Sequence, residues 1–376
     1  MTTKSAFLAD DYEFMSLALK LAEQGLNTTT PNPRVGCVLV KDGKIIGQGA
    51  HLKAGEPHAE IMALRDAEQK SPDKIKGATA YVTLEPCSHF GRTPPCANAL
   101  VDAGIARVVV AMQDPNPKVA GNGLKILAAA GIAVEHGLME AQARELNIGF
   151  VTRMTQNRPY VRVKIAASLD GRTALANGES KWITGEPARQ DVQQWRARSC
   201  AILTGVGTVL ADNPQMNVRI PMPPFATPRQ PLKVIVDSQL RTPADANILK
   251  DGQVLIAYCQ GNNAKEAALS AAGAKLLHIN STDQVCLKAL LNALAERGIN
   301  ELMVEAGQTI NGSLLAANLV DELVLYYAPM ILGTDARGML AIPALQSMQN
   351  RINLQIIDTR QIGQDIRLRA KPIYQP

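Results

Sequence analysis

Residues 85–96 read E-P-C-S-H-F-G-R-T-P-P-C, with a proline directly before Cys87 and another directly before Cys96. Upstream, residues 57–60 read P-H-A-E and supply His58. One histidine and two cysteines are the ligands of a catalytic zinc ion that keeps its fourth coordination position for water. Zinc in such a site lowers the pKa of that water toward neutrality. The two stretches therefore predict one zinc ion per chain and hydrolytic chemistry.

Glu60 lies two residues after His58, and this H-x-E spacing, followed downstream by P-C, is typical of zinc deaminases. In those enzymes the glutamate carries protons without binding the metal. Residues i and i+2 do not share a face in the middle of a helix. His58 and Glu60 can therefore point at one centre only where a helix begins, and Pro57 suits a first helical position. Cys87 and Cys96 also precede residues that could form a helix, whose N-terminus would favour the thiolate.

A structural zinc site is the alternative interpretation of the same residues. Structural sites normally have four protein ligands, and the first half of the chain offers no convincing fourth one. His51, His89 and Cys37 are the candidates to exclude. With a fourth ligand the chain would be a non-catalytic, zinc-stabilised scaffold, and Glu60 would have no chemical role.

Around these stretches the first half of the chain alternates helix and strand patterns, which predicts an α/β sandwich with a largely parallel sheet. Apolar residues at helical spacing predict a helix over 11–25. Lys41-Asp42-Gly43 predicts a tight turn between strands over 35–40 and 44–48. The other predicted helices span 57–70, 96–103 and 123–129, and the other predicted strands span 80–84, 107–112 and 132–135.

The polar stretch 152–159 (TRMTQNRP) is the predicted boundary and gives two domains, 1–155 and 156–376. The second domain alternates again, and residues 220–231 form a loop with five prolines in twelve residues. Its predicted strands span 160–167, 201–204, 232–237, 254–258, 275–279, 301–305 and 323–327, and its main predicted helices span 187–198 and 284–297.

Composition excludes several classes of protein. Of the 376 residues 46% are hydrophobic, which supplies real cores, and only 4% are aromatic, which leaves few platforms for stacking single-stranded nucleic acid. The net charge of +5 falls entirely in residues 158–376 and is too small to indicate nucleic-acid binding. We expect no membrane span and no secretory signal, because the long apolar runs that they need are missing. Six cysteines are too few for a disulfide scaffold, so a cytoplasmic location is expected.

The second half of the chain shows no metal pattern, and it offers Gly-rich turns after predicted strands. Gly205-Val206-Gly207 lacks the third glycine of a dinucleotide fingerprint, because Leu210 stands in its place. Residues 304–313 (VEAGQTINGS) end a strand, and a helix opening at Thr309 or Asn311 could hold phosphate on backbone N–H groups. An ordinary strand–helix connection explains that segment equally well. Three cysteines in or beside apolar segments are expected to be inert: Cys200, Cys259 and Cys286.

The first half resembles the deaminase half of the bacterial bifunctional riboflavin-biosynthesis enzymes. The resemblance rests on N-P-R-V-G-C-V at 32–38, on H-A-E at 58–60 and on the eight-residue insert between the two cysteines. The second half is similar to the reductase half of the same family at 163–174 (VKIAASLDGRTA), 178–184 (GESKWIT), 203–212 (LTGVGTVLAD) and the Glu305 segment. The two resemblances span nearly the whole chain in the same order. They imply an N-terminal cytidine-deaminase-like α/β/α sandwich followed by a dihydrofolate-reductase-like α/β domain that uses NADPH.

The resemblance also implies two substrates. The first half would deaminate 2,5-diamino-6-(5-phosphoribosylamino)pyrimidin-4-one, with Glu60 as the catalytic residue. The second half would reduce the ribosyl group of 5-amino-6-(5-phosphoribosylamino)uracil to ribityl. Asn32 and His51 would contact the first substrate and Arg92 its phosphate, which suits a guanidinium fork.

In the second half the family pattern assigns two further sets of residues. Met216 stands where the family commonly has leucine. The implied substrate contacts are Lys164, Ser180, Arg196, Met216, Arg219 and Glu305. The implied cofactor contacts are Ala166, Trp182, Thr208, Asp212, Ser238, Gly307, Gln308, Thr309, Ile310, Asn311, Gly312 and Ser313. Asp212 and Glu305 are both candidates for the general acid that donates a proton in the reduction.

The expected partners are small phosphorylated pyrimidines and further copies of the chain in a homo-oligomer, with neither nucleic acid nor membrane. A tRNA deaminase is the alternative enzyme, because it would share the H-x-E zinc core. Residues 1–157 carry 16 basic and 16 acidic side chains, and this neutrality counts against RNA binding. The eight-residue insert and the whole second domain would also have no role in such an enzyme.

Overall fold

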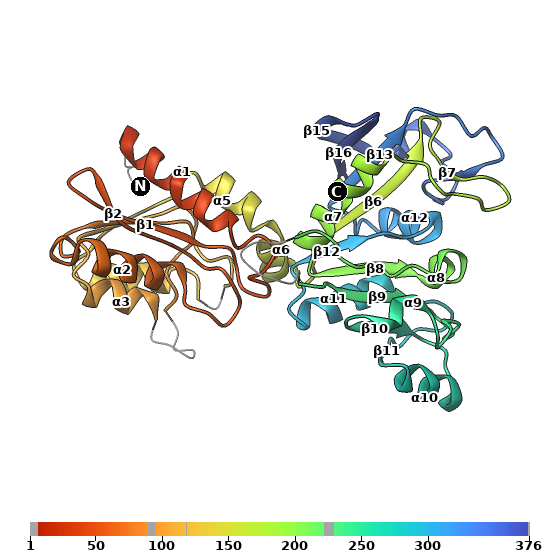
Figure 1. Cartoon of the computed structure of the whole chain (residues 1–376), viewed down its shortest axis with the longest axis horizontal. Coiled ribbons are helices and arrows are strands. Elements are labelled where there is room, and N and C mark those ends of the chain that lie inside the picture. Colours follow the sequence, from red (N-terminus) through yellow and green to blue (C-terminus); the bar gives the residue numbers. More distant parts are fainter. Residues whose placement is uncertain (1–6, 89–94, 118, 222–228, 375–376) are drawn as a thin grey trace. The chain divides into compact units, whose positions relative to one another are not determined.

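The computed structural model describes residues 7–88, 95–117, 119–221 and 229–374. It divides the chain into two compact units, Met1–Asn157 and Arg158–Pro376 (Figure 1). The predicted boundary lies between residues 155 and 156. Each unit has a hydrophobic core of its own. In the described part of the chain, no helix combines the length and the apolar character that crossing a bilayer requires.

A five-stranded sheet with the order β2-β1-β3-β4-β5 forms the centre of the first unit. Strands β3, β4 and β5 pair parallel, and β1 pairs antiparallel with both β2 and β3, so β1 alone runs against the other four strands and the sheet is mixed rather than wholly parallel. The turn at Asp42 and Gly43 has two positive φ angles, 51° and 71°, and reverses the chain into the hairpin. The strands are β1 (Gly36–Lys41), β2 (Lys44–Ala50), β3 (Thr79–Val82), β4 (Arg107–Val110) and β5 (Ala133–His136).

Helices cover both faces of this sheet. Figure 1 shows α1 and α5 on one face and α2 and α3 on the other. Helix α2 packs directly on β2, where a Cβ at Gly49 would lie 2.4 Å from the Ala63 backbone nitrogen. This close approach fixes the start of α2, which carries part of the zinc motif. The helices are α1 (Ala9–Glu23), α2 (Ala59–Lys70), α3 (Cys96–Asp102), α4 (Asn122–Ala129), α5 (Glu140–Leu146) and α6 (Ile148–Gln156).

The second unit contains a nine-stranded sheet with the order β11-β10-β9-β8-β12-β6-β13-β16-β15. Its strands run parallel from β11 to β13, and the C-terminal hairpin of β15 and β16 adds two antiparallel strands at one edge. The strands of this sheet are β6 (Tyr160–Ser168), β8 (Ala201–Gly205), β9 (Leu232–Val236), β10 (Val254–Tyr258), β11 (Ala274–His278), β12 (Glu301–Val304), β13 (Glu322–Ala328), β15 (Asn353–Ile362) and β16 (Asp365–Ile373). A small separate sheet pairs β7 (Arg172–Ala174) with β14 (Arg337–Gly338).

The carboxyl ends of the parallel strands meet at one edge of this sheet. In open α/β sheets, ligands bind outside these carboxyl ends. Strand β8 leads into α8, Ser238 follows β9, and Glu305 follows β12, so several residues singled out in the sequence lie at this edge. The helices of the second unit are α7 (Glu186–Arg198), α8 (Val206–Asp212), α9 (Asn247–Lys250), α10 (Asn263–Ala271), α11 (Leu287–Glu296) and α12 (Gln308–Ala316).

Candidate active sites

The start of α2 brings His58 and Glu60 to one place in the first unit. His58 caps the helix with an extended backbone (φ −73°, ψ 164°), and Glu60 is the second helical residue. Pro57 therefore lies two residues before the helix rather than at its first position. Cys96 is the first residue of α3, as expected, whereas the residues that follow Ser88, up to 94, lie outside the described part of the chain.

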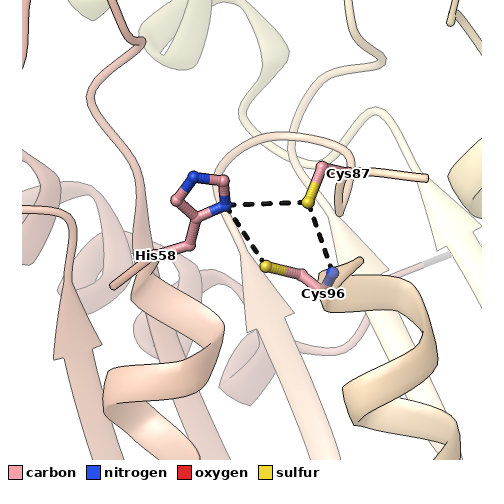
Figure 2. Close-up of side chains that lie close together, drawn as sticks. All are labelled: His58, Cys87 and Cys96. Carbon is pink, nitrogen blue, oxygen red and sulfur yellow. Dashed lines mark hydrogen bonds between the residues drawn. The ribbon is translucent and has the colours of Figure 1, made fainter. Parts of the chain in front are cut away.

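Three side chains converge at this point, as Figure 2 shows. The Nδ1 atom of His58 lies 3.6 Å from the Cys87 sulfur and 3.3 Å from the Cys96 sulfur. A tetrahedral zinc ion with ordinary bond lengths would separate a nitrogen and a sulfur ligand by about 3.6 Å. The backbone N–H of Cys96 also donates to the Cys87 sulfur at 3.3 Å, which stabilises a thiolate there. The donor set and its spacing fit zinc.

His51 lies beside the cluster, but both of its ring nitrogens have other partners. Its Nε2 accepts a hydrogen bond from the Asn32 amide at 3.1 Å, and its Nδ1 donates to the Pro57 carbonyl at 3.1 Å. The rings of His51 and His58 meet edge to face at 5.2 Å. Burial lowers the pKa of His51, which keeps the ring neutral. The structure thus places both predicted pyrimidine contacts, Asn32 and His51, next to the metal ligands.

Among the described residues, the ligand cluster has three members and no fourth. Cys37, one candidate for a fourth ligand, is buried on β1, and burial raises the pKa of its thiol. His89, the remaining candidate, and Arg92, the predicted phosphate contact, lie outside the described residues. Three ligands with an open fourth position are the arrangement of a catalytic rather than a structural zinc site.

Glu60 has the environment of a proton carrier. Its side chain is only 3% exposed, and burial, together with the negative charge of Cys87, raises its pKa to about 7. Hydrogen bonding with Cys96, and then with His58, lowers the pKa of Cys87. A carboxyl group with a pKa near neutrality can both accept and donate a proton at pH 7.

A cavity of about 1340 Å³ lies at the carboxyl edge of the sheet in the second unit. It exceeds the usual range of small-molecule pockets, as a site for a dinucleotide and a second ligand requires. The predicted residues that line it are Lys164, Ala166, Ser180, Trp182, Arg196, Thr208, Asp212, Met216, Arg219, Ser238, Glu305, Gly307, Gln308, Thr309, Ile310 and Ser313.

Two predicted cofactor contacts lie behind the cavity wall instead of in it. Asn311 is 2% exposed, and its side-chain amide donates to the Ala306 carbonyl at 3.0 Å. Gly312 packs against the backbone of Ala341, whose carbonyl oxygen would lie 2.1 Å from an added Cβ. These two residues shape the start of α12, and the structure does not bring them to the cavity.

A charged group of three side chains occupies the cavity wall between β6, β12 and α7. Arg196 donates to both carboxylate oxygens of Glu305, at 2.6 and 2.9 Å. Burial alone would raise the pKa of Glu305, but the guanidinium outweighs it and holds that pKa below its ordinary value. Burial lowers the pKa of Lys164, partly opposed by the charge of Glu305. Arg196 is thus engaged by a carboxylate, whereas Arg219, the other arginine among the predicted substrate contacts, is exposed.

The cavity also includes residues that the sequence did not single out. Arg189 and Lys288 add positive charge to its lining, and Arg189 lies 4.7 Å from the ring of the exposed Trp182. Cys286, expected to be inert, is exposed and lines the cavity, whereas Cys200 and Cys259 are buried. No local motif marks these positions, because isolated charges and single cysteines occur on most protein surfaces.

Comparisons with known proteins divide the chain in the same way. Residues 8–112 match the cytidine and deoxycytidylate deaminase zinc-binding region, and residues 159–368 match the RibD C-terminal domain. The riboflavin biosynthesis protein RibD of Escherichia coli (strain K12) is 49% identical over 368 residues, covering 96% of this chain and 98% of that protein.

Two solved structures resemble the chain over nearly its full length. Acinetobacter baumannii RibD, form 1, has a TM-score of 0.89 and 48% identity, covering 97% of this chain and 99% of that one. A diaminohydroxyphosphoribosylaminopyrimidine deaminase/5-amino-6-(5-phosphoribosylamino)uracil reductase from Thermotoga maritima has a TM-score of 0.85 and 32% identity, with the same coverage. The predicted fold class, a deaminase-like domain followed by a reductase domain, is thereby confirmed.

Proposed function

Because the chain belongs to the RibD family of bifunctional deaminase–reductases of riboflavin biosynthesis, we propose that each unit performs one of two successive steps. The first unit holds zinc, and the second uses NADPH. The first substrate would be the phosphoribosylamino-diaminopyrimidinone named for the Thermotoga maritima relative, and the second would be the phosphoribosylaminouracil. The observation that carries this proposal is the convergence of His58, Cys87 and Cys96 beside the buried Glu60.

In the first step, Glu60 would move the protons. Zinc held by His58, Cys87 and Cys96 would supply a water molecule of lowered pKa. Glu60 would take a proton from that water and give it to the ring nitrogen as the hydroxide adds to the amino-bearing ring carbon. It would then take the proton of the added hydroxyl group and deliver it to the amino group, which leaves as ammonia when the C–N bond breaks. Burial raises the pKa of Glu60 above that of an ordinary carboxyl group, which suits both transfers. Asn32 and His51, already joined by a hydrogen bond, would orient the pyrimidine.

In the second step, Lys164 would be the proton donor. NADPH bound along the carboxyl edge would supply a hydride to C1 of the opened ribosyl group. The two acids left open by the sequence suit this role less well, because Glu305 is held ionised by Arg196 and Asp212 is exposed. The lowered pKa of Lys164 lets it release a proton more readily than an ordinary lysine. Glu305 would keep Arg196 in place, and Arg219 would bind the substrate phosphate.

The proposal is tested by supplying the diamino substrate to the purified chain and measuring ammonia before and after NADPH is added. Ammonia release without NADPH, followed by oxidation of one NADPH per ammonia, is the expected sequence. Ammonia release with no later NADPH oxidation would contradict the proposed reduction by the second unit. Equal oxidation of NADH would remove the preference for NADPH.

A homo-oligomer formed through the C-terminal hairpin is also proposed. Strand β15 is the edge strand of the nine-stranded sheet, and its Leu354 and Ile356 are 44% and 62% exposed. An exposed edge with aliphatic side chains is a template for strand pairing, and an antiparallel pair of two β15 strands would cover both edges. Light scattering should give a mass above that of one chain, and Ile356→Lys should lower it. A monomeric wild-type chain would refute the oligomer.

A cytoplasmic enzyme without nucleic-acid or membrane partners completes the proposal. The balanced charge of residues 1–157 and the 4% aromatic content support it. A filter-binding titration with tRNA at physiological salt should show no saturable binding. Micromolar binding would revive the tRNA-deaminase alternative.

A further inference from the structure

Glu85, two residues before Cys87, has a carboxylate that is bound by backbone groups rather than exposed to water. Its side chain is 6% exposed. One carboxylate oxygen accepts the backbone N–H groups of Asp114 at 3.1 Å and Gly121 at 2.9 Å. The other oxygen accepts the N–H of Gly123 at 2.8 Å. Each of these bonds to a charged acceptor is stronger than a bond between neutral groups.

The three partners follow β4 in the chain. Asp114 and Gly121 belong to the connection from β4 to α4, whose described residues 113–117 and 119–121 we call the 113–121 loop, and Gly123 lies in the first turn of α4. Asp114 stands near the beginning of the loop and Gly121 at its end, so one carboxylate ties both ends. Inside the loop, Asn116 donates its N–H to the Asp114 side chain at 2.8 Å. Glu85 thus adds hydrogen bonds from outside the loop to the bonds that its described residues make among themselves.

The loop also lies against the segment that carries Cys87. A cavity of about 10 Å³ is lined on one side by residues 85–88 and on the other by Asp114 and Val119. A space of this size holds at most one water molecule, so the two segments are close-packed. At the start of α4, a Cβ on Gly123 would lie 2.1 Å from the carbonyl oxygen of Pro86. The backbone on the N-terminal side of Cys87 therefore touches α4 directly.

We propose that Glu85 is a positioning residue for the zinc site, which fixes the Cys87 segment and the 113–121 loop to each other as one wall of that site. This role rests on the proposed deaminase function. Cys87 comes from a segment without helix or strand, so its sulfur has no regular element of its own to hold it. Supporting groups outside the ligand shell commonly change metal affinity or activity by about 10- to 100-fold when they are replaced.

Glu85→Gln in the full-length holoenzyme tests this role. The amide replaces one carboxylate oxygen by an NH₂ group, which must face at least one backbone N–H as a second donor. We expect the dissociation constant of zinc, measured by competition with a chelating indicator, to rise on the order of 10-fold. The kcat/KM for ammonia release should fall by at least the same factor, whereas NADPH oxidation with the deaminated substrate should not change.

Asp11→Asn is the matched control. Asp11 is also a buried carboxylate of the first unit, and it accepts hydrogen bonds from the Leu8 N–H, the Tyr81 hydroxyl and Arg107. This variant should lose stability and keep its zinc affinity within twofold. Gly123→Ala adds a methyl group where α4 contacts the Pro86 carbonyl oxygen, and it should push the Cys87 segment away from α4. This variant should therefore weaken zinc binding as Glu85→Gln does.

Wild-type zinc affinity in both Glu85→Gln and Gly123→Ala would overturn the role, and so would an equal loss of zinc affinity in Asp11→Asn at matched thermal stability. If Glu85→Gln does not fold, Gly123→Ala alone decides between these results. Zinc affinity is measured without substrate. A wild-type chain that released no ammonia would therefore contradict the proposed function, while the zinc measurement would still decide the role of Glu85.

Discussion

The zinc site of the first unit and the cavity of the second unit are built in different ways. The three zinc ligands come from two short stretches, 57–60 and 85–96, and their donor atoms lie within 4.8 Å of one another. The cavity collects side chains from β6, α7, α8 and the segments after β9 and β12. A metal dictates residue types and distances, whereas a cavity for organic ligands can be lined by many combinations of residues.

This difference predicts different sensitivities. Each member of the zinc site has one chemical task, so its loss should remove a reaction. Members of the cavity share binding among many contacts, so the loss of one should change a rate or an affinity by a smaller factor. Because one chain carries both sites, each reaction serves as the control for variants of the other.

The largest effect is expected for Glu60→Ala. Removal of a positioned general acid–base should lower the rate of ammonia release by on the order of 10³- to 10⁴-fold. Zinc content, measured by atomic absorption, should stay at the wild-type level, because Glu60 is not a ligand. Substantial ammonia release by the zinc-loaded variant would remove Glu60 from the mechanism.

A smaller effect is expected for Arg196→Lys in the second unit. Lysine cannot make the two parallel hydrogen bonds that Arg196 makes to Glu305. Loss of this preorganised pair should lower kcat/KM for the reduction by on the order of 100-fold. Steady-state NADPH oxidation measures it, and unchanged ammonia release shows that the first unit is intact. Wild-type reduction by this variant would mean that the pair is only a structural contact.

A still smaller effect is expected for Arg219→Ala. If Arg219 binds the substrate phosphate, KM for the phosphorylated substrate should rise on the order of 10-fold while kcat stays constant. A substrate analogue without the phosphate should show the same KM with both proteins. An equal rise of KM for both substrates would place Arg219 elsewhere than at the phosphate.

The smallest effect on activity is expected for Asp11→Asn, which should change stability only. A hydrogen bond from Arg107 lowers the pKa of Asp11 to about 2 from an ordinary 3.8. A lowered carboxyl pKa stabilises the folded state above pH 4, and this contribution disappears as the pH falls from 4 to 2. It amounts to about 2 kcal/mol. Thermal unfolding at pH 7 should show the loss, and the difference from wild type should vanish near pH 2.

The local parts of the fold could be predicted from the sequence. Asp42-Gly43 produced the expected hairpin turn, and the spacing of His58, Cys87 and Cys96 indicated the metal site before their distances were known. In both places, neighbouring residues along the chain determine the geometry. The domain boundary was harder to predict, because residues 152–156 are mostly polar and yet form the last turns of α6. Phe150 and Thr152 are buried there, and Asn157, which caps the end of the helix, has a positive φ.

The C-terminal hairpin could not be predicted, because charged side chains occupy its inward positions. Arg367 of β16 is buried and pairs with Asp191 at 2.8 Å, while Ile366 next to it is 42% exposed. Arg369 pairs with Glu322 at 2.6 Å. The charged side chains on this face of β16 are therefore explained only by their tertiary partners, although Leu368 packs against the core and Ala370 is buried.

Contacts between the site residues of the second unit could not be predicted from the sequence either. Arg196 and Glu305 are far apart in the sequence, and no motif contains both, so their ion pair depends on the parallel arrangement of the sheet. For the same reason, the sequence could not show that the Asn311 amide binds the Ala306 carbonyl or that Gly312 packs against Ala341. Glu85 lies two residues before Cys87 in the sequence, but its three backbone partners come from a later segment.

Removal of zinc from the purified chain tests the separation of the two sites most directly. After dialysis against a chelator, ammonia release from the diamino substrate should be lost, and NADPH oxidation with the deaminated substrate should continue at the rate of the untreated protein. Added zinc should restore ammonia release. Full ammonia release from zinc-free protein, or parallel loss of both reactions, would contradict a zinc site that serves the first reaction alone.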